Sequence, residues 1–184
     1  MKKFELRRTV ALVAALNLAY FLVEFSFAAI FDSLALLSDS LDFLEDASIN
    51  LLILLAMAWS IQARRKVSYI LALVLLMPGF IFIVEAISRF NNPVQPNGLG
   101  MSVISVGALL VNLYCALLLA NHKADIGGLA KAAFLSARND ALANLLIIAA
   151  GLLTLFWVSQ IPDLVIGVII FSMNFDAALK VLRA

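Results

Sequence analysis

Four acidic residues lie within eight positions of an otherwise apolar segment: Asp39, Asp42, Glu45 and Asp46. At about 100° per residue, the three aspartates share one helical face with Asn50, and Glu45 lies beside that face. Because Asp42 and Asp46 are one turn apart, their carboxylates point to the same site. Two anions at low dielectric need protons, a cation or a basic partner. A divalent cation meets that need, and its binding would release any protons that the carboxylates held.

Two further polar stripes could complete such a site. Ser136, Asp140 and Asn144 are spaced four apart, and Asn17 and Glu24 are seven apart, so each set shares one face of a helix. The interior offers few other polar groups, so we expect the stripes to face one another. Asp140 would add a third oxygen ligand, and Ser136 or a water a fourth. The same acids can hold metal ions or protons, as exchange transport requires.

Blander interpretations exist for these acids. Asp39 and Glu45 could lie near a membrane face or pair with a cation, because acids near helix ends cost little. Asp42, Asp46 and Asp140 could form a polar clamp between helices, but three acids lack an obvious counter-charge. Arg138 is the one candidate, and it lies about 160° around its helix from Asp140.

The composition requires a lipid environment. The chain has 184 residues, of which 64% are hydrophobic and 14% charged, whereas soluble domains are nearer half apolar and a quarter charged. A helix needs about 20 apolar residues to cross the hydrocarbon. We therefore predict an all-α, six-helix polytopic transmembrane bundle forming a single domain. The predicted spans are residues 10–30, 34–61, 67–88, 101–121, 131–158 and 162–182.

The acidic segment is the least apolar of the six. It must still cross the membrane. If it did not, the short linkers on both sides of it would have to connect neighbouring spans whose ends lie on opposite faces of the membrane. Its acids are therefore expected inside the bundle. The basic residues set the orientation: they cluster before the first span, between the second and third, around the start of the fifth, and at the C-terminal end. This positive-inside pattern predicts that both termini face the cytoplasm.

Other features limit the classes of function. Cys115 is the one cysteine, so neither an intrachain disulfide nor a cysteine-cluster metal site can form. A net charge of +1 gives no pull toward nucleic acid. The sequence contains no nucleophile–base pair or nucleotide-binding loop, so we expect no enzyme activity and no tightly bound cofactor. The basic start followed by small residues at Ala28 and Ala29 also allows a cleaved signal peptide, but cleavage would break the even number of spans.

Residues 17–54 resemble the first two helices of the cation diffusion facilitator family. The shared features are Glu24, the sequence Ser33-Leu34-Ala35-Leu36, and Asp39 followed by a [His/Asp]-x-x-x-Asp motif, read here from Asp42 to Asp46. Residues 136–144 look like the family's His-x-x-x-Asp segment, and Pro162-Asp163 with Gly167 is similar to its last span. The resemblance implies a cation-efflux transmembrane domain that works as a homodimer and exports a divalent metal in exchange for protons. It places the transport site at Asp42, Asp46, Asp140 and the position of Ser136.

The sequence departs from the family pattern twice. Ser136 replaces the usual His, which leaves oxygen ligands alone and suits harder ions such as manganese, although the affinity order favours zinc. The sequence also ends just after the last span, so we expect no counterpart of the family's usual cytoplasmic C-terminal domain and expect dimerisation to rest on membrane contacts.

The predicted function is proton-coupled efflux of a divalent cation such as zinc, cadmium, cobalt or manganese, with the lipid bilayer and a second copy as partners. The resemblance and compact size suggest a bacterial inner membrane. Accessory roles are expected for Glu24, Asp39, Glu45, Asn50 and Asn144. One alternative is a membrane subunit that keeps the fold without transporting. Another is a proton-coupled carrier of a small organic cation, for which Tyr20 and Phe43 could supply aromatic faces.

Overall fold

The computed structural model describes the backbone of residues 2–56, 60–120 and 128–183. Within these ranges, side chains are described except at residues 2–3, 56, 61, 63–66, 68–69, 71–76, 128–138 and 174–183. The described chain is folded into six helices and contains no strand, which confirms the all-α prediction. They are α1 (Lys2–Ile30), α2 (Leu34–Ala56), α3 (Ile61–Asn91), α4 (Gly98–Ala120), α6 (Gly128–Phe156) and α7 (Ile161–Arg183).

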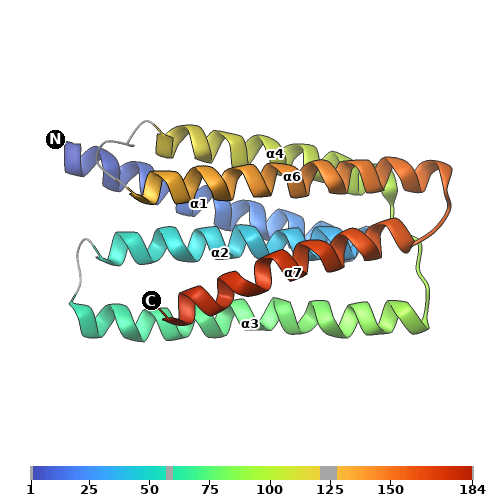
Figure 1. Ribbon diagram of the computed structural model, residues 1–184, viewed down its shortest axis with the longest axis horizontal. Coiled ribbons are helices and arrows are strands. Elements are labelled where there is room, and N and C mark those ends of the chain that lie inside the picture. The colour runs from blue at the N-terminus through green and yellow to red at the C-terminus, as the bar shows by residue number, and fades with distance from the viewer. Residues whose placement is uncertain (1, 57–59, 121–127, 184) are drawn as a thin grey trace.

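The helices form one elongated bundle in which consecutive helices run in opposite directions (Figure 1). Both termini lie at one end. We call the opposite end, which carries the α1–α2, α3–α4 and α6–α7 connections, the distal end. α1 packs most extensively against α2, and α4 against α6. α7 runs obliquely across the bundle and contacts α2, α3 and α6.

α2 is the central helix, even though it carries the most acidic residues. Every residue from Ser33 to Leu41 is buried, on all faces of the helix. A helix buried all round is normally hydrophobic all round, so the polar residues of α2 must contact other protein rather than lipid. A core of Leu34, Leu36, Met101, Ile147 and Ile170 surrounds its first turns.

The outer surface of the bundle is apolar. Large side chains such as Phe80, Leu117 and Phe156 are well exposed at the protein surface, which a soluble domain avoids over so large an area. Three described segments are long and apolar enough to cross a membrane: Phe4–Ile30, Gly98–Ala120 and Asn139–Phe156. α7 contributes a shorter apolar stretch, Ile161–Met173.

Small residues allow two helix pairs to approach closely. A Cβ on Gly151 of α6 would lie 2.5 Å from the Gly98 carbonyl oxygen of α4, and a Cβ on Gly167 of α7 would lie 2.9 Å from the Leu34 carbonyl carbon of α2. Both distances are too short for a real side chain. Such close backbone contact is how membrane helices gain packing energy without a hydrophobic driving force.

Candidate functional site

Three predicted site residues are described with their side chains, and they are partly exposed. Asp42 and Asp46 on α2 and Asp140 on α6 are neither fully buried nor fully open. Asp140 is the charge that acts most strongly on Asp42, ahead of Asp39, Glu45 and Asp46. The fold therefore brings the polar stripes of α2 and α6 together in the bundle, with their carboxylates as electrostatic neighbours.

The carboxylates are close but are not gathered at ligand distances. Among the described side chains, no group of three or more His, Cys, Asp or Glu residues is close enough to hold a metal ion. The Ser136 and Arg138 side chains, the predicted fourth ligand and the candidate counter-charge, lie outside the described part of α6. In this conformation Asp42, Asp46 and Asp140 thus form an open acidic cluster rather than a closed metal cage.

Each cluster helix carries an asparagine one turn after an aspartate. Asn50 Nδ2 donates to the Asp46 carbonyl oxygen at 2.8 Å, and Asn144 Nδ2 donates to the Asp140 carbonyl oxygen at 2.7 Å. Both asparagines are buried, and the Asn144 Oδ1 atom has no donor among the described residues. The amide groups are thus held against their own helices, which leaves a carbonyl oxygen of Asn144 in the interior.

Glu24 and Asp39 form a second acidic pair, and it is completely buried. Both residues have 0% of their surface exposed, and none of their four carboxyl oxygens receives a hydrogen bond from a described donor. The two carboxyl groups are electrostatic neighbours between α1 and α2. The sequence grouped Asp39 with the α2 stripe and Glu24 with Asn17. In the structure Asp39 neighbours Glu24. Asn17 is also buried, and Cys115 Sγ lies 4.0 Å from its Oδ1 atom.

Asp163 has a structural role that the sequence did not reveal. Its Oδ2 atom accepts a hydrogen bond from Leu34 N at 2.7 Å, and its Oδ1 atom accepts from Ser33 Oγ at 2.6 Å and Ala35 N at 3.1 Å. Asp163 is 1% exposed. A carboxylate of α7 therefore satisfies two of the free N–H groups at the start of α2, and the Ser33 hydroxyl accepts a third, from Leu36 N at 3.1 Å. The acid in the first turn of α7 was visible in the sequence, but its partner 130 residues away was not.

Further contacts close the distal end around this cap. Arg89 at the end of α3 donates to the carbonyl and carboxylate oxygens of Asp32, which adopts a left-handed backbone conformation with φ of 53°. Gln160 Nε2 donates to the Arg89 carbonyl oxygen, and Val94 N donates to Gln160 Oε1. These bonds connect the α1–α2, α3–α4 and α6–α7 turns, so the distal ends of α2, α3 and α7 are fixed relative to one another.

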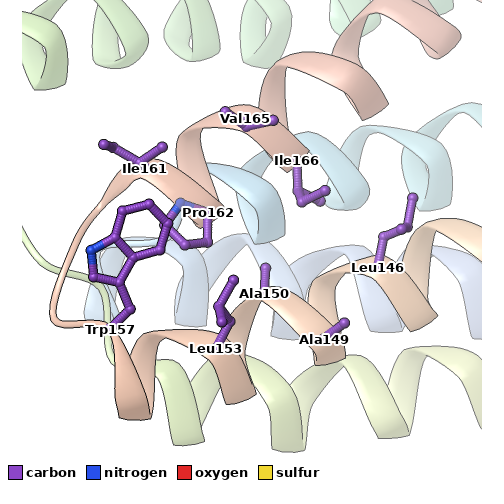
Figure 2. Close-up of a pocket in the computed structure, with 9 residues that line it drawn as sticks. All are labelled: Leu146, Ala149, Ala150, Leu153, Trp157, Ile161, Pro162, Val165 and Ile166. Carbon is purple, nitrogen blue, oxygen red and sulfur yellow. The ribbon is translucent and has the colours of Figure 1, made fainter.

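The cavity between α6 and α7 is unrelated to the acids (Figure 2). It measures about 340 Å³ and is lined by apolar side chains, including Leu153, Trp157, Pro162 and Ile166. No carboxylate lines it. A cation has no ligand there, so this hollow is not the transport site.

The aromatic residues near the acids are packed against each other. The rings of Tyr20 and Phe43 have their centroids 5.0 Å apart, and Tyr20 Oη donates to the Ile104 carbonyl oxygen at 2.6 Å. Phe43 is 1% exposed. Because the two rings contact each other, they do not frame an open cage for an organic ammonium ion.

Comparison with known proteins agrees with this architecture. The family model of the cation efflux transmembrane domain matches residues 10–184. The chain belongs to this family. The assignment confirms the predicted resemblance and the prediction that the chain is a multi-pass membrane transport protein rather than an enzyme.

A curated relative gives the same picture at lower similarity. Over 177 residues the chain is 28% identical to the cadmium, cobalt and zinc/H(+)-K(+) antiporter of Bacillus subtilis (strain 168). The match covers 85% of this chain and 56% of the relative. The chain therefore corresponds to little more than half the length of that antiporter.

Proposed function

We propose that this cation efflux domain exports a divalent metal ion in exchange for protons, with Asp42, Asp46 and Asp140 as the metal ligands. The observation that carries the proposal is the position of Asp140 on α6 as the strongest charged neighbour of Asp42 on α2. Three carboxylates on two facing helices repel one another, and a cation or protons between them would relieve that repulsion. The relative's exchange of cadmium, cobalt or zinc for H(+) and K(+) supports the same reaction class.

The open arrangement of the acids suggests how transport proceeds. The carboxylates are partly exposed and the described side chains do not form a three-ligand site in this conformation, so we propose that α2 and α6 move closer when an ion binds at all three. Since the distal ends of α2, α3 and α7 are tied together, the movement would be largest toward the opposite end. We propose that this end, with both termini, lies on the cytoplasmic side of a bacterial inner membrane, and that the protein works as a homodimer.

Metal uptake into proteoliposomes tests the proposal. Purified protein is reconstituted with a pH-sensitive dye inside, and zinc, cadmium, cobalt and manganese are supplied outside. We expect metal entry coupled to proton exit, and at least a tenfold loss of both in Asp46→Ala and Asp140→Ala. Glu85→Gln, an acid-to-amide change at a half-exposed position of α3, is the matched control and should transport normally. A folded wild-type protein that neither binds nor moves any of the four metals would favour the non-transporting subunit.

The ligand set can be tested by restoring the missing histidine. Ser136 lies one turn before Asp140 on α6, and an imidazole there would add the nitrogen ligand that zinc prefers over manganese. We expect Ser136→His to raise the ratio of zinc to manganese affinity by about tenfold, measured by isothermal titration calorimetry. An unchanged ratio would remove position 136 from the proposed site.

A further inference from the structure

Glu24 and Asp39 present a physical problem that the metal site does not solve. Both side chains are fully buried, come from different helices, and receive no hydrogen bond from a described donor. Isolated ionised carboxylates are very costly at low dielectric, and two that face each other are worse. While no cation is bound nearby, the pair is stable in the core only if a proton or a cation lies between the two groups.

Among the described side chains, the neighbouring groups do not supply the missing charge. Tyr20 lies close enough for the charges of both acids to act on it, but its hydroxyl donates to the Ile104 carbonyl oxygen. On α2, the nearest other acid is Asp42, whose charge also acts on Glu24.

The charged groups described on the other helices are already engaged or are negative themselves. On α7, Asp163 accepts hydrogen bonds from the start of α2. On α3, Arg89 is bonded to Asp32 and lies near Glu85. On α6, Asp140 adds another negative charge near Asp42.

The surroundings of the pair fit a proton better than a metal ion. A divalent cation in an oxygen site takes about six ligands, whereas this pair offers two neighbouring carboxyl groups and a hydroxyl that is already used. A single proton turns the repulsive contact into a charge-assisted O–H···O⁻ hydrogen bond, which is short and strong. No further ligand is then required.

The position of the pair connects it to the proposed metal site. Asp39 precedes Asp42 by three residues, about 4.5 Å along the helix axis, in the direction of the distal end. The pair is sealed, whereas Asp42 and Asp46 are partly exposed. A positive charge arriving at Asp42 would stabilise the ionised form of both Glu24 and Asp39 and favour release of their proton. Occupancy of the two sites would then be mutually exclusive, which is the requirement for exchange.

We propose that Glu24 and Asp39 share one proton and form a proton-carrying site, separate from the metal ligands, that supplies a counter-transported proton. The inference rests on the proposed function for its role in exchange, but the shared proton itself does not. In the metal-free state Glu24 holds the proton and Asp39 accepts its hydrogen bond. When metal binds at Asp42, the proton leaves and both carboxylates are ionised.

Infrared difference spectroscopy tests the shared proton without transport. The wild-type protein at neutral pH should show a carboxylic acid C=O band that disappears when zinc or manganese is added. Glu24→Gln, which keeps the shape of the side chain, should remove that band, and Glu85→Gln should keep it. A band that Glu24→Gln leaves intact would overturn the proposal. If Glu24→Gln does not fold, Asp39→Asn makes the same test from the other side of the pair.

Proteoliposome flux tests the role in exchange. Glu24→Gln should bind metal within about threefold of the wild-type affinity and still move it down its own gradient. The number of protons moved per metal should fall by about one, and an imposed pH gradient should no longer drive metal accumulation. A wild-type proton ratio in Glu24→Gln would overturn the inference, and so would a tenfold loss of metal affinity, which would place Glu24 in the metal site. A variant that loses dependence on a potassium gradient while its proton ratio is unchanged would identify the pair as a potassium site instead.

The two proposals fail in different ways. If the wild-type protein transports metal and Glu24→Gln moves the same number of protons per metal, the proposal of a shared proton is wrong, whereas the proposed metal transport is supported. If the wild-type protein shows the infrared band but neither binds nor moves metal, the shared proton stands and the exchange function is wrong.

Discussion

Two sets of buried carboxyl groups in this bundle are treated in opposite ways. Asp163, at the distal end, is 1% exposed and accepts three hydrogen bonds from Ser33, Leu34 and Ala35. Glu24 and Asp39, deeper in the core, are 0% exposed and accept none from the described donors. Both sets lie at contacts with α2, but only the first has the donors that a buried anion needs.

This difference separates a structural acid from the pair that we propose to carry a proton. A fully bonded carboxylate fixes two helices and should stay ionised and in place. A buried pair without donors gains nothing for the fold, because apolar side chains of similar volume would do as well or better. The proposed proton, which binds and leaves during exchange, would give this pair a role that apolar side chains cannot have. Four sets of substitutions test that distinction through their effects on the free energy of unfolding.

The strongest test removes the bonded acid. Asp163→Ala leaves the Ser33 hydroxyl and the Leu34 and Ala35 N–H groups buried without an acceptor. We expect the free energy of unfolding to fall by about 3 kcal/mol, because each bond to a charged acceptor contributes about 1.5 kcal/mol or more and partial rehydration recovers some of it. Denaturant titration in mixed micelles measures this. Asp163→Asn, which keeps one oxygen acceptor, should lose less, and equal losses in both variants would contradict the capping role.

The opposite result is expected when the unbonded pair is replaced. The double variant Glu24→Met with Asp39→Val fills the space with apolar groups and removes two orphan carboxyls. We expect its free energy of unfolding to be unchanged or raised by about 1–3 kcal/mol in the same titration, while coupled transport is lost. A clear destabilisation would mean that the pair is a structural clamp after all, and the contrast with Asp163 would disappear.

The closeness of α2 and α7 can be tested beside the cap. A Cβ on Gly167 would lie 2.9–3.0 Å from backbone atoms of Leu34 and Ala35, and neither backbone can easily move while Asp163 holds them. We expect Gly167→Ala to reduce the free energy of unfolding by about 1–2 kcal/mol. Gly79→Ala in α3 is the matched control, because its Cβ would lie 3.7 Å from the Phe171 ring, an ordinary contact. Equal stability of the two variants would contradict the close approach.

The smallest effect is expected at the rim of the distal end. Arg89 is bonded to Asp32, whose side chain is 52% exposed, so solvent screens the pair. We expect Arg89→Gln to change the free energy of unfolding by about 0.5 kcal/mol and to leave metal transport intact. A loss comparable to that of Asp163→Ala would show that the rim contacts, rather than the cap, hold the distal end together.

Much of the architecture was visible in the sequence because a membrane helix has a simple signature. Long apolar runs, short loops and segregated basic residues predicted a six-helix bundle. The described chain has six helices, and consecutive helices run in opposite directions. α2 starts at Leu34, the residue from which its span was predicted, and the four-residue spacing placed Asp42 and Asp46 on one face. α1 and α3 extend further than the apolar runs, to Lys2 and to Ile61 and Asn91, because a helix does not end where its hydrophobicity ends.

The pairing of the acids could not be predicted in the same way. Helical spacing states which residues of one helix share a face, but not which face meets which. Asn17 and Glu24 are both buried, as two residues on one inward face of α1 would be, but Glu24 neighbours Asp39 of α2 whereas Asn17 lies beside Cys115 of α4.

The sequence by itself determined that this chain is a membrane bundle with acids inside it, because local spacing and hydropathy depend on neighbours a few residues apart. The tertiary structure decided which of those acids are bonded, which are half-open and which are sealed without a donor. Those differences depend on contacts between residues up to 130 positions apart. Burial and hydrogen bonding arise where helices cross, so the same residue type has three different roles along one central helix and its neighbours.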